Sequence, residues 1–207
     1  MLIKILSSKL KSLSLVLLVV CLSAPSAVLA EKKKYSKSEL EQSLVEIELR
    51  LKKNPHDMDM LESKVATLEV LGRRSEAEQI CESAVKAGVD RPFIWRFLGF
   101  CKYKERNWSE ALPLFKRAES MGESGSAGFV AYCLRRLGRH EECLKFTNEK
   151  IQQYPNDAIL YLGRGLARQA LQQSKTLVCA DLWKAAQLDP SLIDVHRKSC
   201  SEEDSSK

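Results

Sequence analysis

The sequence contains few of the residues and motifs that carry out catalysis or hold a cofactor. Among its 207 residues there are only three histidines, His56, His140 and His196. Serine, aspartate and histidine form no nucleophile motif, and there is no glycine-rich loop of the kind that binds phosphates. His140 and Cys143 have a spacing that a zinc site could use, as do His196 and Cys200, but neither pair is accompanied by a second pair of ligands. We therefore predict that the protein is not an enzyme and has no catalytic residues, no cofactor and no metal.

Net positive charge is also small, which argues against nucleic acid as a partner. The formal net charge of the chain is +6, and Lys4, Lys9 and Lys11 contribute half of it from residues 1–30, where no acidic residue occurs. Residues 31–207 therefore carry a net charge of only +3, which is too little to indicate a nucleic-acid surface by itself. Apolar residues make up 44% of the chain, as is ordinary for a folded protein.

Residues 1–30 have the features of a secretory signal peptide. A lysine-bearing start precedes the apolar run LSLVLLVVCL, which suits a signal-peptide core and is short of the roughly 20 residues that a membrane span needs. Val28 and Ala30 place small side chains where a signal peptidase reads, so we expect cleavage between Ala30 and Glu31. The alternative is an uncleaved anchor at residues 13–29, which would be the chain's only contact with a membrane. We predict export to a periplasm, the secreted space or an organelle lumen.

The rest of the chain has helical periodicity and no strand-like alternation of useful length. Four segments share a small residue, a large apolar residue four positions later and usually another small residue three beyond, as in Ala111, Phe115 and Ala118. This spacing places the three side chains on one stripe of a helix, where small residues let a neighbouring helix approach closely. The equivalent first positions, Ala77, Ala111, Cys143 and Val178, are separated by 34, 32 and 35 residues. The pattern indicates a repeat built from two helices.

Local signals predict where these helices begin and end. Three pairs of a polar residue and a glutamate predict capped helix starts: Ser38 with Glu41, Ser75 with Glu78, and Asn107 with Glu110. Pro55, Pro155 and Pro190 are expected just after helices, because proline stops one helix and starts the next. Pro113 falls inside a predicted helix, and we expect it near the first turn of that helix, where it can bend the axis.

One segment matches a known repeat pattern closely. Its residues Trp95, Leu98, Gly99, Ala111, Phe115 and Ala118 stand in the order W-x2-L-G … A-x3-F-x2-A. This segment resembles the tetratricopeptide repeat (TPR), and the other segments resemble it more loosely. Sel1-like repeats are the nearest rival, but they require more glycines than the nine in this chain. The TPR resemblance implies an all-α, right-handed helical-hairpin solenoid of about four repeats plus capping helices.

The resemblance also divides the chain into segments. Residues 1–30 form the predicted signal peptide, and residues 31–56 form a linker and a capping helix, with the helix at residues 37–53. Residues 57–190 form the TPR domain. Residues 191–207 form a short C-terminal cap and a disordered tail.

Binding residues are expected on the first helix of two successive repeats. In TPR arrays the first-helix positions that the pattern leaves open line a concave groove, where extended peptides or partner helices bind. The resemblance therefore predicts this protein-binding set: Phe93, Arg96, Phe97, Phe100, Tyr103, Lys104, Phe129, Tyr132, Arg135 and Arg136. The same positions of the first repeat include acidic residues, Asp59, Glu62 and Glu69. The alternatives are that the aromatic residues pack on one another, that they close a homodimer, or that they have no binding role.

We therefore predict an exported, non-enzymatic protein–protein interaction scaffold, an adaptor or assembly factor, that holds a peptide or a partner helix in the groove. Arginine and aromatic residues carry much of the binding energy at interfaces, and an acidic or amphipathic segment suits Arg96 and Arg136. The lysine and asparagine clamp of chaperone co-factors is not expected, because the groove positions lack asparagine. The alternative is a self-associating structural component of the cell envelope, in which the same face closes a homodimer.

The cysteines leave two possibilities open. Six of them follow the predicted signal peptide: Cys81, Cys101, Cys133, Cys143, Cys179 and Cys200. An even number in an exported chain is typical of disulfides, whereas the first four stand at apolar or packing positions that suit buried thiols. Cys81 and Cys101 could be neighbours, but the sequence does not determine any pairing.

Overall fold

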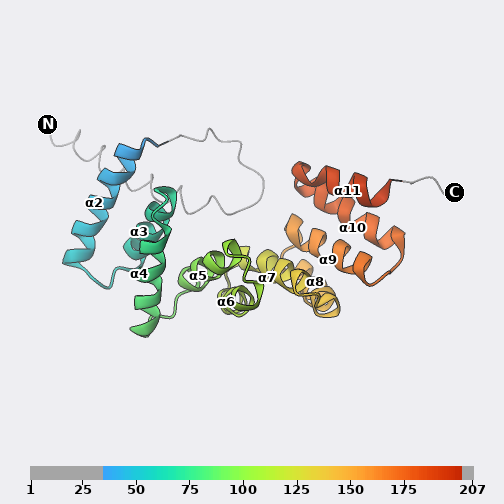
Figure 1. Cartoon of the computed structure of the whole chain (residues 1–207), viewed down its shortest axis with the longest axis horizontal. Helices are drawn as coiled ribbons and strands as arrows, with labels where there is room; N and C mark the ends of the chain where they lie inside the picture. The colour runs from blue at the N-terminus through green and yellow to red at the C-terminus, as the bar shows by residue number, and fades with distance from the viewer. Residues whose placement is uncertain (1–34, 202–207) are drawn as a thin grey trace. The chain divides into compact units, whose positions relative to one another are not determined.

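The computed structural model describes residues 35–201, and this part of the chain is almost entirely helical (Figure 1). It contains ten α-helices and one short 3-10 helix, and no strand occurs within the described range. The helices are α2 (Lys37–Lys53), α3 (Met58–Val70), α4 (Arg74–Lys86), α5 (Pro92–Lys104), α6 (Trp108–Ser120), α7 (Gly125–Arg136), α8 (His140–Gln153), α9 (Ala158–Ala170), α10 (Lys175–Leu188), η2 (Pro190–Leu192) and α11 (Ile193–Cys200). None of the helices in residues 35–201 is long and apolar enough to cross a membrane. The predicted signal peptide and residues 202–207 lie outside the described residues.

The helix starts confirm one of the three predicted caps. The side chain of Asn107 accepts a hydrogen bond from the backbone N–H of Glu110 at the start of α6. At α2 the capping box is formed by Ser36 and Glu39, so the predicted box at Ser38 is wrong by two residues. The predicted cap at Ser75 is also wrong, because α4 begins earlier and its first turn is not capped by a side chain.

The prolines lie where the sequence predicts. Helices α2, α8 and α10 end just before Pro55, Pro155 and Pro190. Pro113 lies inside α6 as predicted, at its sixth residue, directly after the first turn, and the helix continues through it to Ser120.

Six helix ends in the described chain close on a residue with positive φ. Four of these residues are glycines, Gly72, Gly88, Gly122 and Gly138, and the other two are Arg106 (φ 60°) and Gln172 (φ 53°). At the end of α7, the N–H of Gly138 donates to the carbonyl of Arg135 and the N–H of Arg139 donates to that of Leu134. This paired arrangement is the Schellman motif, which satisfies carbonyls that the helix leaves without partners.

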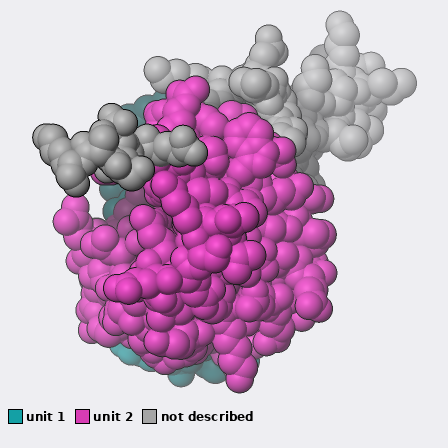
Figure 2. All heavy atoms as spheres, turned by 90° about the vertical axis from the view of Figure 1, so that its right-hand side faces the viewer, with its two compact units in different colours: residues 1–101 teal, residues 102–207 magenta. Residues whose placement is uncertain are grey.

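The described helices group into two compact units, coloured separately in Figure 2. Unit 1 ends at Cys101 and unit 2 begins at Lys102, so the division falls in the last turn of α5.

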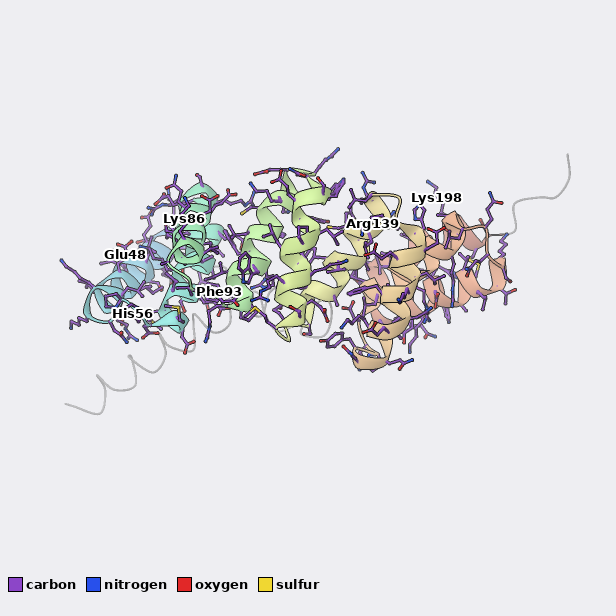
Figure 3. All side chains as sticks on the ribbon, turned by 90° about the horizontal axis from the view of Figure 1, so that it is seen from below. Glu48, His56, Lys86, Phe93, Arg139 and Lys198 are labelled. Carbon is purple, nitrogen blue, oxygen red and sulfur yellow. A yellow bond between two sulfur atoms is a disulfide. The ribbon has the colours of Figure 1, made fainter. Side chains whose placement is uncertain are left out.

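In unit 1, α3 packs against both α2 and α4. Helix α2 buries Leu40, Leu44 and Ile47, whose spacing places them on one face. Lys64 of α3 forms an ion pair with Glu48 of α2 at 2.9 Å (Glu48 is labelled in Figure 3). In α5, Trp95 is half-buried, and its indole N–H donates to the carboxylate of Asp90 at 2.6 Å.

In unit 2, α7 packs against α6, α8 and α9. The predicted stripe of small and large residues on α6 is confirmed, since Ala111, Phe115 and Ala118 are each 0% exposed. The predicted packing position Cys143 of α8 is also buried, and its thiol donates to the carbonyl of Ala131 at 3.4 Å. A Cβ atom at Gly163 of α9 would lie 3.1 Å from the Cβ atom of Ala131. Small residues therefore let α7 and α9 approach closely.

A polar cluster joins three helices of unit 2. The carboxylate of Asp181 in α10 is 4% exposed and accepts from Arg164 and Arg168 of α9, each at 2.6 Å. Arg164 also donates to the side-chain carbonyl of Asn148 in α8 at 3.1 Å. Two cations thus share one buried anion between α8, α9 and α10. Figure 1 shows these three helices toward the C-terminal end of the chain.

The cysteines divide into one disulfide and four buried thiols. Cys179 of α10 is bonded to Cys200 at the end of α11. The other four in the described range, Cys81, Cys101, Cys133 and Cys143, form no disulfide and are buried. The pairing of Cys81 with Cys101 that the sequence left open therefore does not occur.

Candidate protein-binding site

Five aromatic rings of unit 2 form a connected cluster. They are Tyr103 of α5, Trp108 and Phe115 of α6, and Phe129 and Tyr132 of α7. The ring of Tyr103 lies 5.3 Å from that of Trp108, 5.3 Å from that of Phe129 and 5.1 Å from that of Tyr132, centre to centre. Trp108 and Tyr132 are 5.4 Å apart. We call these five residues the aromatic cluster.

The inner side of the aromatic cluster is part of the core. Phe115 is fully buried, and its ring stacks on that of Phe129 at 4.7 Å with an angle of 10° between the planes. Burial raises the pKa of the Tyr103 phenol, and the adjacent Tyr132 raises it further through charge repulsion and a hydrogen bond. Packing of the aromatic residues on one another, one of the alternatives that the sequence left open, therefore applies to Phe129 and Tyr103.

The outer side of the aromatic cluster carries two arginines. The guanidinium of Arg135 lies over the ring of Tyr132 at 5.2 Å, and that of Arg136 lies over Trp108 at 5.4 Å. Arg135 is half-buried and Arg136 is exposed. Both stand in the last turn of α7, a helix that contains no acidic residue. Within residues 35–201, no carboxylate forms an ion pair with either arginine.

The predicted residues of unit 1 are placed differently. Phe93, labelled in Figure 3, and Phe97 are each 5% exposed and offer a partner almost no surface. Arg96 and Phe100 are half-buried, and the guanidinium of Arg74 lies over the Phe100 ring at 5.9 Å. The structure therefore corrects the expectation that all ten predicted side chains are open to a partner.

Of the predicted set, unit 2 brings together Tyr103, Phe129, Tyr132, Arg135 and Arg136. Lys104 is also in unit 2 and is exposed. Trp108 belongs to the same surface and was not predicted, because the TPR resemblance implies binding residues on the first helix of each repeat. The sequence does contain a signal for Trp108, because this aromatic residue directly follows the predicted cap Asn107. It therefore begins α6, next to Tyr103 at the end of α5.

In the part of the chain that the structure describes, no group of three or more histidine, cysteine or acidic residues is placed to hold a metal ion. His140 begins α8, and its Nδ1 atom is buried without a hydrogen-bond partner. His196 of α11 lies against the ring of Trp183, with ring centres 5.3 Å apart.

Comparisons with known proteins support the fold. No protein-family model matches the chain, and no curated protein matches it. Solved structures do match: YrrB, a TPR protein with an unusual peptide-binding site, aligns with a TM-score of 0.62 at 21% identity over 78% of this chain and 84% of its own. A structure of MamA aligns with a TM-score of 0.61 at 15% identity over 82% of this chain and 99% of its own. MamA AMB-1 aligns with a TM-score of 0.59 at 17% identity, covering 74% and 92%.

These likenesses and the helical architecture confirm the predicted fold class. The chain has an all-α, TPR-type helical-hairpin fold. At these levels of identity the likeness concerns the fold alone. A shared fold does not determine a function, which depends on the residues of this chain.

Proposed function

We propose that the chain is an exported, non-enzymatic scaffold, an adaptor or assembly factor, that binds a peptide or a partner helix. The observation that carries this proposal is the pair Arg135 and Arg136, which lie over the half-buried rings of Tyr132 and Trp108 without an ion-pair partner in the described chain. The peptide-binding site of YrrB, a protein of the same fold, adds support.

The residue types at this surface suit recognition of a protein. Arginine, tyrosine and tryptophan are the residues most often found at the energetic centre of protein interfaces. Here Arg135, Arg136, Tyr132 and Trp108 are held together by ring contacts, so few side-chain rotations would be lost on binding. An acidic or amphipathic segment is the partner that this surface favours.

Export is supported by the disulfide between Cys179 and Cys200. Disulfides persist in oxidising compartments such as the periplasm, the secreted space and the lumen of the secretory pathway, and they are rare in a reducing cytosol. The test is N-terminal sequencing of the chain recovered from its native compartment. A first residue of Glu31 is expected, and an intact Met1 on the recovered chain would argue for the uncleaved anchor.

The binding role is tested by comparing partners captured by the wild type and by Tyr132→Ala/Arg136→Ala. A matched control, Lys184→Ala/Gln187→Ala, changes two α10 residues outside the aromatic cluster. We expect the first variant to lose partners that the wild type and the control both retain, while circular dichroism shows equal helix content. Retention of every partner by Tyr132→Ala/Arg136→Ala would show that the surface is not the binding site.

A further inference from the structure

We propose that Arg135 and Arg136 together form a receptor for two carboxylates of an acidic segment in the partner. This inference rests on the proposed binding function and specifies the chemistry of the partner. It is carried by a comparison between these two arginines and a third one in the same unit.

Arg164 shows the complete arrangement within this chain. Its guanidinium lies over the ring of Tyr161 at 5.5 Å, and its nitrogen atoms donate to the carboxylate of Asp181 at 2.6–3.1 Å. One face of the guanidinium is thus occupied by the ring, and its N–H edge holds a carboxylate through two parallel hydrogen bonds.

Arg135 and Arg136 have the ring contact of this arrangement, but within the described residues they lack the carboxylate. Their guanidinium groups lie over Tyr132 and Trp108, at distances similar to that of Arg164 from its ring. No carboxylate in residues 35–201 meets their N–H groups in an ion pair. Because ring contact restricts each guanidinium before a ligand arrives, less rotational freedom is lost when a carboxylate binds.

The charges of unit 2 are arranged so that no internal acid takes this position. Two glutamates of unit 2 are engaged elsewhere: Glu142 of α8 forms ion pairs with Lys116 and Arg139, and Glu119 of α6 forms one with Lys150 at 2.6 Å. Helix α7 contains two basic residues, Arg135 and Arg136, and no acidic residue. The surface of α7 therefore keeps a positive charge that complements an acidic segment.

Other anionic partners fit this surface less well. The rings of the aromatic cluster contact one another and the two arginines, so they are not open platforms on which bases could stack. None of the large apolar side chains exposed in the described chain belongs to the cluster, as insertion into a lipid surface would require. The favoured ligand is a peptide with carboxylates spaced closely enough to reach two neighbouring arginines.

The experiment measures binding of labelled twelve-residue peptides to the purified full chain by fluorescence anisotropy at low ionic strength. One peptide contains four glutamates among glycine and serine, and its match contains glutamine instead. We expect the glutamate peptide to bind at least about tenfold more tightly, since truncating such an arginine contact often costs a factor of ten or more. Arg135→Gln/Arg136→Gln is expected to abolish the difference, and Arg135→Lys/Arg136→Lys to reduce it, because lysine keeps the charge without the planar fork.

The control is Lys184→Gln/Lys198→Gln, which removes the same charge from α10 and α11. It should leave the preference for glutamate intact. The inference is overturned if neither peptide binds, if the glutamine peptide binds equally well, if the control loses the preference as fully as the arginine variant does, or if a twelve-nucleotide oligothymidylate binds more tightly than the glutamate peptide. In those cases the proposed function still stands if Tyr132→Ala/Arg136→Ala loses captured partners, so the two failures are distinguishable.

Discussion

At the scale of single residues, Arg106 and Gln172 occupy a backbone position that four other helix ends of this chain give to glycine. A left-handed φ crowds the Cβ atom of any other residue against the following carbonyl. The two side chains therefore hold strain that the glycines at equivalent turns do not.

We predict that Arg106→Gly and Gln172→Gly each raise the free energy of unfolding by up to about 1 kcal/mol, because glycine adopts this conformation without the steric cost. Chemical denaturation with urea measures the change. The matched control is Gly138→Ala, where no atom lies within 4 Å of the added Cβ, so that any loss comes from the backbone conformation alone. Destabilisation by either glycine substitution would contradict the prediction.

The buried thiols should be unreactive in the folded chain. Burial raises the pKa of Cys81 and Cys133 to about 12 and that of Cys143 to about 11. Since the thiolate is the reactive form, labelling by a disulfide reagent should stay slow between about pH 8 and 10, where an exposed thiol ionises. Cys21, in the predicted signal peptide, is replaced by serine so that the only thiols in the chain are the four buried ones. In this Cys21→Ser chain the four thiols should react fast only in denaturant.

These thiols also affect stability in a defined direction. A pKa raised in the folded state means that the unfolded chain loses its thiol protons first as the pH rises. The thiol contribution to stability is therefore fully present below about pH 9 and decreases as the pH rises toward about 12. The prediction of slow labelling would be contradicted by fast, stoichiometric labelling of the native chain at pH 8, which would show that the thiols are accessible.

At the scale of the helices, the cluster of Arg164, Arg168 and Asp181 should contribute strongly to the packing of α9 on α10. Asp181→Ala leaves two largely buried cations without their anion, and we predict a loss of about 3–5 kcal/mol in the free energy of unfolding. Thermal and urea unfolding measure it. Replacing all three residues by Met, Met and Leu should recover most of the loss, because apolar packing avoids the burial of charge.

Lys116→Ala serves as the control for this prediction. It breaks the ion pair with Glu142, whose side chains are 43% and 38% exposed, so a cost below about 1 kcal/mol is expected. Equal effects of the two substitutions would mean that the buried cluster has no special role.

Helix α11 is a second element whose stability can be predicted. It contains no buried residue; the disulfide and the pairing of His196 with Trp183 join it to α10, and Lys175 of α10 donates to the carbonyl of Ser201, directly after α11. We predict that Cys200→Ser, or reduction of the wild type, frees α11 and speeds tryptic cleavage after Arg197 and Lys198. Mass spectrometry of the digest measures it. Unchanged protection would show that noncovalent packing alone holds the helix.

The sequence predicted the elements better than their ends. The capping helix at residues 37–53 has the predicted bounds, because its start, apolar spacing and following proline are all local signals. The cap itself was misplaced, since Ser36 and Ser38 both resemble capping residues and only hydrogen-bond geometry distinguishes them. Likewise, the choice of Cys200 as the partner of Cys179 depends on tertiary proximity, which spacing does not encode.

The candidate site was predicted in part, for a related reason. A helical projection identifies which residues share a face, and Tyr103, Tyr132 and Arg136 do gather on one surface. A helical projection does not show how deeply a side chain is buried. It therefore could not distinguish Phe93 and Phe97, which are buried, from residues that are accessible to a partner. Depth depends on the neighbouring helices, which also bring Trp108 to the site.

At the scale of the whole molecule, the proposed scaffold and the self-associating alternative differ in assembly. If Arg135 and Arg136 bind a different protein, the purified chain should be monomeric in light scattering at micromolar concentration. A dimer that Arg135→Gln/Arg136→Gln converts to monomer would instead favour the alternative in which this face closes a homodimer. A dimer unaffected by that variant would place the contact elsewhere.

The disulfide between Cys179 and Cys200 also makes the chain a record of where it folded. A chain made in a reducing cytosol would carry two additional thiols, both half-buried, whereas the other four thiols of residues 35–201 are buried in either case. Alkylation before and after reduction, read as a shift in mass, therefore reports the compartment of origin of any purified sample. It follows that measurements on protein produced in the cytosol and on exported protein concern molecules that differ at their C-terminal end.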